Sequence, residues 1–364
     1  MRKLYLPGLP QEWLFPTTRY RGSKRKILGW LWENICGLEF ETALDLFGGT
    51  SVVSLLFKQM GKQVTYNDYS YFNFLTGLAF IENNKFKLSD ADIEFIIGNA
   101  KRSDDFISKT FKGIYFPDDE NSWLDKTLGN ISALGDIHEG EELKYKYALS
   151  VWALGQSCLI KRPFNLFHRK NLYIRTNTVK RNFGNKTTWE IPFEKAFKRF
   201  AAEANQIVFD NKRANCSTRI NALDYKNVEY DLVYLDPPYF FKNQSDPEYL
   251  KLYHFLDGLA QYSTWKELID VTSPIKLLKL TEPPWAHNSV EKLESVFSEL
   301  ICKFKKSKIV ISHKEGSLLT VDKFEGMLTE NGKKCSVFKK QYSYALNHQN
   351  GKSHENNECL IIGE

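Results

Sequence analysis

Residues 43–68 carry the pattern that most constrains the fold of this chain. A short apolar run at 43–47 is followed by two glycines, and then by a segment at 51–60 whose apolar positions have helical spacing. Residues 63–68 have the composition of a second strand that ends in polar side chains. A strand, a glycine turn, a helix and a strand in this order form a βαβ unit, which predicts a parallel sheet.

The alternation of strands and helices lapses between residues 81 and 204 and then resumes. We therefore predict an α/β fold with a Rossmann-like, mostly parallel sheet flanked by helices, interrupted by an inserted and mainly helical domain. The predicted sheet domain comprises 1–80 and 205–364, and the insertion comprises 81–204. The later strand-like segments lie at 217–224, 231–235, 308–312, 334–338 and 358–363.

The composition narrows the class of protein. Of the 364 residues, 42% are hydrophobic and 26% are charged, which allows a full core and excludes a disordered chain. No apolar run approaches the roughly 18 residues of a membrane span, and the proline-broken N-terminus lacks the apolar stretch of a signal peptide. The six cysteines are far apart and show no zinc or redox spacing. We expect a cytoplasmic protein with reduced thiols, no bound metal and no membrane contact.

Positive charge is concentrated in the predicted insertion. Residues 161–200 hold eleven Lys and Arg side chains against two Glu, a local net charge of +9 compared with +6 for the whole chain. Such a segment suits the phosphates of a nucleic acid, although a basic helix packed on the core would have the same composition. The candidates for DNA contact are Arg162, Arg169, Lys170 and Arg175, with Phe164, Phe167 and Tyr173 interleaved.

The sharpest functional signal is the sequence Asp236-Pro237-Pro238-Tyr239, directly after an apolar strand at 232–235. Two prolines remove two N–H donors, so the turn offers backbone carbonyls and a carboxylate that only accept hydrogen bonds. An amino group on a flat ring needs acceptors for its two hydrogens and an aromatic surface for its face. Asp236, the Pro237 carbonyl and the Tyr239 ring meet that need, while a simple strand-ending turn is the alternative.

Further polar residues follow the other strands. Asp68 ends the second strand about 20 residues past the glycines, where an acidic side chain can bind ribose hydroxyls. Asp224 precedes the strand at 232–235 and could accept from an adenine amino group. The glycine loop can let a ligand approach the backbone, but it lacks the third glycine of the dinucleotide fingerprint, which argues against NAD or FAD. Its candidate ligand-binding residues are Asp45, Phe47 and Gly48.

The order of these motifs along the chain resembles the adenine-specific DNA amino-methyltransferases of the Dam-like class, which use S-adenosylmethionine. In that family a Lys-bearing glycine motif, here Tyr20 to Lys24, precedes a glycine loop, an Asp-ended strand, a recognition insertion and Asp-Pro-Pro-Tyr. The resemblance covers roughly 17–80 and 205–260 well. It implies a cofactor pocket at Tyr20, Lys24, Asp68 and Asp236, and a target-base pocket at Asp236, Pro237 and Tyr239.

The resemblance implies transfer of the methyl group of S-adenosylmethionine to N6 of an adenine that has left the stack of duplex DNA. It also implies a possible partner, the restriction endonuclease of a restriction–modification system. The alternatives are a methyltransferase acting on cytosine N4 or on RNA adenine, and a non-enzymatic nucleic-acid-binding module. A nicotinamide-dependent oxidoreductase is disfavoured, because it leaves the basic insertion unexplained.

Overall fold

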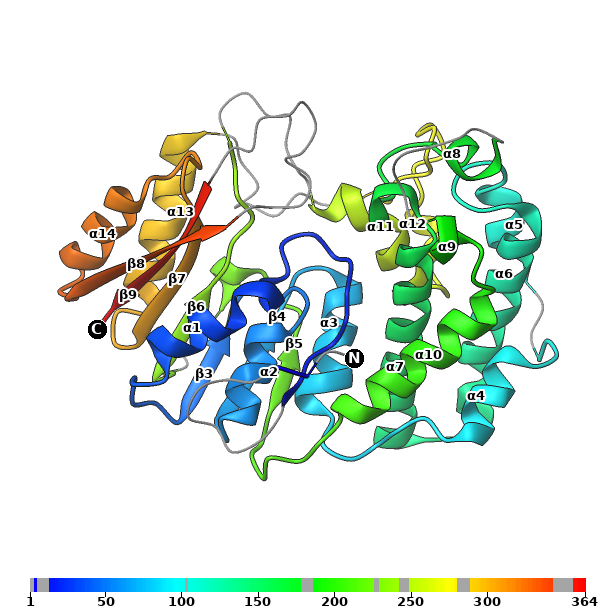
Figure 1. Ribbon diagram of the computed structural model, residues 1–364, viewed down its shortest axis with the longest axis horizontal. Helices are drawn as coiled ribbons and strands as arrows, with labels where there is room; N and C mark the ends of the chain where they lie inside the picture. The colour runs from blue at the N-terminus through cyan, green and yellow to red at the C-terminus, as the bar shows by residue number, and fades with distance from the viewer. Residues whose placement is uncertain are drawn as a thin grey trace.

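The computed structural model describes residues 3–4, 13–101, 104–177, 186–225, 229–241, 249–279, 289–342 and 356–364. A seven-stranded sheet with the order β5-β4-β3-β6-β7-β9-β8 organises one half of the molecule (Figure 1). A short antiparallel ribbon of β1 (Lys3–Leu4) and β2 (Trp13–Leu14) lies outside this sheet. The sheet strands are β3 (Thr42–Asp45), β4 (Gln63–Asn67), β5 (Cys216–Thr218), β6 (Leu232–Leu235), β7 (Lys308–Lys314), β8 (Cys335–Tyr342) and β9 (Asn356–Gly363).

Strands β5, β4, β3, β6 and β7, which are neighbours in this order, are parallel to one another. Strand β9 runs antiparallel to both of its neighbours, β7 and β8. The chain leaves β3 toward β4 on one side and returns to β6 on the other. The carboxyl ends of β3, β4 and β6 therefore meet at a topological switch point, where α/β sheets form their ligand sites.

Helices cover both faces of the sheet because its strands are buried on both sides, as in the all-buried LVYL run of β6. Leu232 and Tyr234 face one apolar cluster, and Val233 and Leu235 face the other. The first face is covered by η1 (Lys24–Ile27), α1 (Leu28–Ile35), α2 (Val52–Gln59), α3 (Tyr71–Gly77) and η2 (Leu78–Glu82). The second is covered by η5 (Ala222–Asp224), α13 (Val290–Lys303) and α14 (Val321–Glu330).

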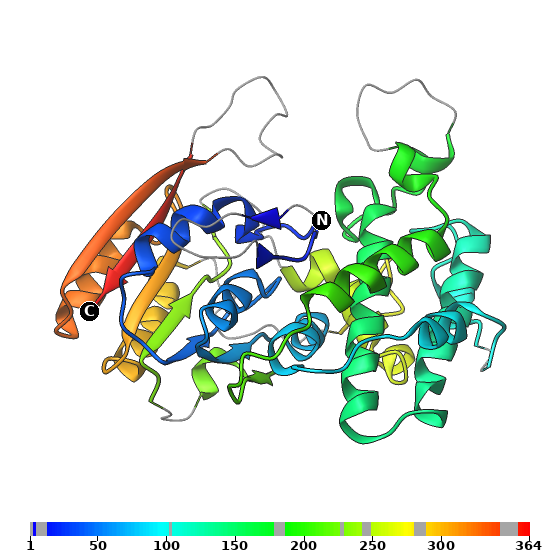
Figure 2. The same cartoon turned by 60° about the horizontal axis from the view of Figure 1, so that its bottom comes forward.

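A helical region lies beside the β5 edge of the sheet, and Figures 1 and 2 show it from two sides. Its amphipathic helices bury apolar faces against one another, as α10 does with Phe193, Phe197 and Phe200. Its elements are α4 (Asp90–Ile97), α5 (Phe106–Thr110), α6 (Asp118–Ser132), η3 (Ala133–Asp136), α7 (Gly140–Ile160), η4 (Pro163–Asn165), α8 (Tyr173–Thr176), α9 (Lys186–Trp189), α10 (Phe193–Ile207), α11 (Tyr249–Ala260) and α12 (Trp265–Leu268).

The predicted fold class is confirmed, with two local differences. Residues 217–224 are not one strand, because Asn221 accepts a hydrogen bond from the Leu223 amide and starts a 3-10 turn. The helical region also receives α11 and α12, which follow the Asp-Pro-Pro-Tyr turn in sequence. Phe255 of α11 stacks on Phe167 with ring centroids 4.9 Å apart, so aromatic packing draws this later segment onto the insertion.

Candidate active site

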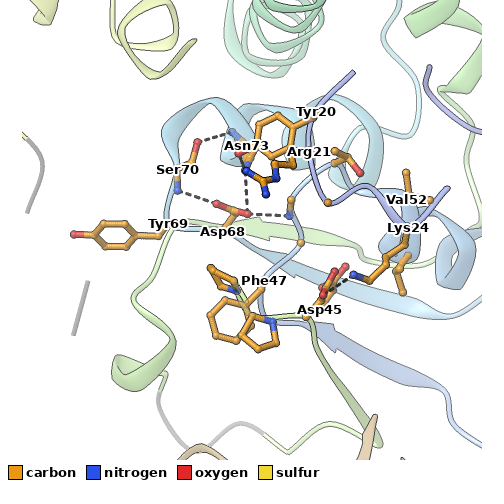
Figure 3. A pocket seen from close by; sticks show the side chains of 18 of the residues that line it. Tyr20, Arg21, Lys24, Asp45, Phe47, Val52, Asp68, Tyr69, Ser70 and Asn73 are labelled. Carbon is orange, nitrogen blue, oxygen red and sulfur yellow. Dashed lines mark hydrogen bonds and ion pairs between the residues drawn. The ribbon is translucent and has the colours of Figure 1, made fainter. Parts of the chain in front are cut away.

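A pocket opens at the switch point of the sheet, between the ends of β3, β4 and β6 and the segment before η1 (Figure 3). It encloses about 900 Å³, open solvent at its mouth included, which suits a small organic ligand. Most of the residues singled out in the sequence line this single pocket. They are Tyr20, Lys24, Asp45, Phe47, Gly48, Asp68, Asp236, Pro237, Pro238 and Tyr239.

The glycine loop after β3 needs its two glycines for different reasons. A Cβ on Gly48 would lie 2.1 Å from the ring of Tyr66 in β4, so only hydrogen fits there. Gly49 has φ +50°, a left-handed conformation that glycine adopts at little cost. Its amide donates a 2.8 Å hydrogen bond to Asp68, and its carbonyl accepts from the Tyr66 hydroxyl at 2.8 Å. The loop is thus packed on β4 and aims an amide at the next strand's carboxylate.

Asp68 follows β4 and forms the centre of a hydrogen-bonded cluster (Figure 3). Besides the Gly49 amide, it accepts from the Ser70 amide at 2.8 Å and from the Asn73 side chain at 3.2 Å. Burial raises the pKa of Asp68 to about 6, although these donors act to lower it. Three donors fill three of the roughly four acceptor positions of a carboxylate, so Asp68 can still accept from one ligand hydroxyl.

Asp45 is the last residue of β3 and is 1% exposed. Its Oδ2 accepts from the Ser54 hydroxyl at 2.5 Å, whereas Oδ1 has no partner among the described residues. Burial raises the pKa of Asp45 to about 7. A buried acceptor without a partner in a pocket wall calls for a donor on a ligand.

Lys24 joins the pocket carboxylate Asp236 to a second, fully buried carboxylate, Glu358. Its ammonium lies 2.8 Å from Asp236 Oδ1 and 3.1 Å from Glu358 Oε1, and it donates to the Tyr239 hydroxyl at 2.6 Å. Burial raises the pKa of Asp236 to about 6, Lys24 lowers it and Glu358 raises it. Asp236 is 18% exposed and Lys24 5%, so this is a largely desolvated cluster.

Tyr20 also lines the pocket and is held by α11. Its ring stacks on Tyr253 with centroids 3.8 Å apart, and its hydroxyl accepts from Asn73 at 3.3 Å. The Tyr253 hydroxyl accepts from the Arg21 amide at 2.7 Å. In the same helix, Asp257 accepts from the Ser70 hydroxyl at 2.6 Å. The segment after the Asp-Pro-Pro-Tyr turn therefore fixes two walls of the pocket.

One predicted ligand residue does not join the others. Asp224 ends the 3-10 turn η5, is exposed and does not line the pocket. Strand β5 ends at Thr218, so Asp224 belongs to the 3-10 turn and not to the carboxyl end of a strand. We therefore exclude Asp224 from the candidate site.

The four predicted DNA contacts divide into buried and exposed pairs. Arg162 is 1% exposed and donates to the carbonyls of Tyr115, Leu166 and Arg169. Arg175 makes a two-pronged ion pair with Glu120 at 2.7 and 2.8 Å. Both guanidiniums thus hold the helical region together, which corrects the expectation that they face DNA.

Arg169 and Lys170 are exposed and follow η4. Phe164 and Tyr173 on either side are 42% and 60% exposed, whereas Phe167 is fully buried. Two further basic residues of the insertion, Lys180 and Arg181, lie outside the described residues. Of the predicted cations and interleaved aromatic rings, Arg169, Lys170, Phe164 and Tyr173 are therefore accessible at the surface, whereas Phe167 belongs to the core.

Sequence reasoning missed Glu358, which is fully buried and contacts Lys24 and Tyr239. Its signal is an acidic residue directly before the apolar run CLII in the last strand-like segment, ECLIIG. A buried strand places a charge at such a position only where a partner neutralises it. Within the described residues, no cluster of three or more side chains could hold a metal ion.

The comparison with known families identifies the chain. The sequence pattern of the D12 class N6 adenine-specific DNA methyltransferases matches residues 20–304. This chain belongs to that family. The match spans the pocket, the helical region and the Asp-Pro-Pro-Tyr turn, so the predicted methyltransferase family and the predicted enzyme class are confirmed.

Individual relatives agree with the family. The Type II methyltransferase M2.HphI of Haemophilus parahaemolyticus is 25% identical over 363 residues, covering 96% of this chain and 98% of the relative. The Type II methyltransferase M.NlaIII of Neisseria lactamica is 23% identical over 254 residues, covering 67% and 69%. The modification methylase StsI of Streptococcus sanguinis is 25% identical over 256 residues, covering 67% of this chain and 36% of the relative.

Proposed function

We propose that this adenine methyltransferase uses S-adenosylmethionine and modifies one specific sequence in duplex DNA, as the partner of a restriction endonuclease. The names of its relatives, two Type II methyltransferases and a modification methylase, support that setting. The observation that carries the proposal is a single pocket lined by Lys24, Asp45, Asp68 and the Asp-Pro-Pro-Tyr turn.

The side chains of the pocket fit S-adenosylmethionine. The unpartnered Oδ1 of Asp45 suits an ammonium group, and the remaining acceptor position of Asp68 suits a ribose hydroxyl. Tyr20, Phe47 and Gly48 provide apolar wall and backbone around these polar groups. Bound S-adenosylmethionine would supply a methyl group on a positively charged sulfur.

The Asp-Pro-Pro-Tyr turn is the proposed target-base site. Asp236 and the Pro237 carbonyl accept the two hydrogens of the adenine N6 amine, and Pro238 keeps the turn free of competing N–H donors. These acceptors draw the nitrogen lone pair out of the ring and favour the positive charge that develops on N6. The Tyr239 ring is the proposed surface for the base, replacing about 1–3 kcal/mol of lost stacking. Holding the adenine amine and the methyl group in line is the largest contribution of the site to the rate of methyl transfer.

The helical region is the proposed DNA-recognition part of the chain. Arg169 and Lys170 are its proposed phosphate contacts, since both are exposed and follow η4. The free state of all six cysteines favours the reducing cytoplasm, where such an enzyme meets its DNA. None of the described helices is long and apolar enough to span a membrane.

Methylation of defined substrates tests the proposal. The purified chain is incubated with labelled S-adenosylmethionine and duplex DNA, and digested nucleosides are separated by mass spectrometry. We expect 6-methyladenine at one sequence, with Asp236→Ala inactive but still able to bind DNA. Label in 4-methylcytosine alone, or in RNA but not DNA, would contradict the proposed acceptor. Absence of S-adenosylmethionine binding by calorimetry would contradict the proposed cofactor.

A further inference from the structure

We propose that Glu358 is a positioning residue for methyl transfer. It accepts a hydrogen bond from the Tyr239 hydroxyl, and it contacts Lys24, which also contacts Asp236. Its negative charge keeps Asp236 electron-rich toward the adenine amine. This inference rests on the proposed role of Asp236 as an acceptor. Glu358 comes from the last strand of the chain, beyond the segment matched by the family pattern.

The antiparallel direction of β9 explains how Glu358 reaches the pocket. The parallel strands end at the pocket edge, whereas β9 begins there, with Glu358 paired to Lys314 at the end of β7. Residues near the start of β9 thus share an edge with Asp236, which follows β6. Glu358 is fully buried, so its carboxylate needs partners from within the protein.

Three donors meet on one oxygen of this carboxylate. Glu358 Oε1 lies 2.8 Å from the Tyr239 hydroxyl, 2.9 Å from the Ser312 hydroxyl and 3.1 Å from the Lys24 ammonium. A fully buried side chain with this set of contacts is held in one position. It therefore fixes the two pocket groups, Lys24 and Tyr239, that also touch Asp236.

The number of hydrogens decides what Tyr239 can do. Its hydroxyl oxygen lies 2.8 Å from Glu358 and 3.0 Å from Asp236, yet a phenol has one hydrogen to donate. We assign that hydrogen to Glu358, which is the more buried and gives the shorter contact. Asp236 Oδ1 then receives from Lys24, and Oδ2 has no partner among the described residues. Asp236 thus keeps capacity for the N6 amine.

The charges lead to the same role. Lys24 alone would neutralise Asp236 and weaken it as an acceptor for a nitrogen that becomes positive. Glu358 adds a second negative charge, so the ionised cluster carries a net charge of −1. Both carboxylate oxygens lie within 3.0 Å of the Tyr239 hydroxyl, hence no more than about 6 Å apart. At that separation in a partly buried site, one carboxylate raises the pKa of the other.

Among the described residues, few other titratable groups face the two carboxylates. Burial lowers the pKa of His313 to about 4, so this ring is neutral above pH 5. Burial raises the pKa of Tyr234 well above its usual value, so the phenol stays neutral. In the part of the chain that the structure describes, the charged neighbours include Lys24 from η1, Asp45 from β3, and Lys314 and Lys340 opposite Glu358 in β7 and β8.

The variant Glu358→Gln tests the proposal because it keeps the shape of the side chain and removes its charge. We expect kcat to fall roughly tenfold to a hundredfold, with S-adenosylmethionine affinity unchanged. The acid limb of the pH profile of kcat/KM should move down by about one to two pH units, because Asp236 loses a neighbouring negative charge. Glu315→Gln is the matched control, since Glu315 pairs with Lys339 at the same sheet edge outside the pocket.

An acid limb of Glu358→Gln that coincides with that of the wild type would overturn the inference, even if stability and kcat fall. If Glu358→Gln fails to fold, Tyr239→Phe tests the same inference. If the phenol donates to Glu358, the acid limb of Tyr239→Phe stays in place; an upward shift means that it donates to Asp236 and overturns the assignment. A wild-type enzyme that makes no 6-methyladenine would instead defeat the proposed function.

Discussion

Replacing Lys24 with methionine removes the cation that joins the pocket carboxylate Asp236 to the buried carboxylate Glu358. Lys24 is 5% exposed and lies 2.8 Å from Asp236 and 3.1 Å from Glu358. Methionine keeps a similar length and packing, but it leaves two negative charges facing each other in a desolvated site. Removing one partner of a buried ion pair costs about 3–5 kcal/mol. We expect the free energy of unfolding to fall by that amount at pH 8.

The loss should shrink as the pH is lowered. Lys24 lowers the pKa of Asp236, which burial raises to about 6, so Lys24→Met raises this pKa further. A carboxyl whose pKa is higher in the folded than in the unfolded state contributes stability at low pH. That contribution is lost as the pH rises through the folded pKa. The variant should therefore approach the wild type near pH 5 and differ most at pH 8.

Urea titrations of the wild type and of Lys24→Met give the difference in their free energies of unfolding at pH 5 and at pH 8. Lys26→Met is the control, since Lys26 is an exposed lysine in the same turn. A penalty for Lys24→Met that is equal at both pH values, or below about 1 kcal/mol as for a surface pair, would refute the reasoning.

Three further predictions concern other parts of the molecule. Gly48→Ala should cost about 1–3 kcal/mol of stability in thermal unfolding, because its Cβ meets an aromatic ring at 2.1 Å, whereas Gly37→Ala, with nothing within 4 Å, serves as the control. Methyl transfer by the wild type should decline as the pH falls through about 6, since Asp236 accepts the amine best when ionised; a flat pH–rate profile down to pH 5 would argue against this. Arg162→Met should lower stability by about 3 kcal/mol, because it leaves buried carbonyls unpaired. Lys170→Ala should leave stability unchanged and reduce the salt dependence of DNA affinity by one counterion. The reverse pattern would contradict the division into buried and exposed cations.

Much of the fold could be predicted from the sequence because the patterns that specify its strands, helices and turns span only a few neighbouring residues. The strand, glycine turn, helix and strand of residues 43–68 form as the periodicity predicts, from β3 through α2 to β4. The all-apolar run of β6 and the Asp-Pro-Pro-Tyr turn after it are equally local signals. Parallel strands end at one edge of a sheet, so the polar residues that follow β4 and β6, Asp68 and Asp236, line one pocket. That Lys24 joins them was implied by the resemblance to the methyltransferase family, because Lys24 opens η1 and does not follow a strand.

The distribution of charge along the sequence was a less reliable guide to which basic residues are exposed. The basic segment at 161–200 has the same composition whether its side chains face DNA or the core. Arg162 and Arg175 are buried because carbonyls and Glu120 from distant parts of the helical region surround them, and no local pattern records those partners. Exposure is a property of the packed molecule, so it separates Lys170 from Arg162 where residue type does not.

By itself, the sequence determined the strand–turn–helix–strand unit of residues 43–68, the apolar strand β6 and the polar residues that follow β4 and β6, because period and turn chemistry act over a few neighbouring positions. Only the tertiary structure decided that β9 runs antiparallel and brings Glu358 to Lys24 and Tyr239, more than a hundred positions earlier in the chain. It also decided that Tyr20 is held by Tyr253 and that Asp224 lies outside the pocket. Such contacts depend on how distant segments pack, and the free energy of that packing is not encoded in any single stretch of the chain.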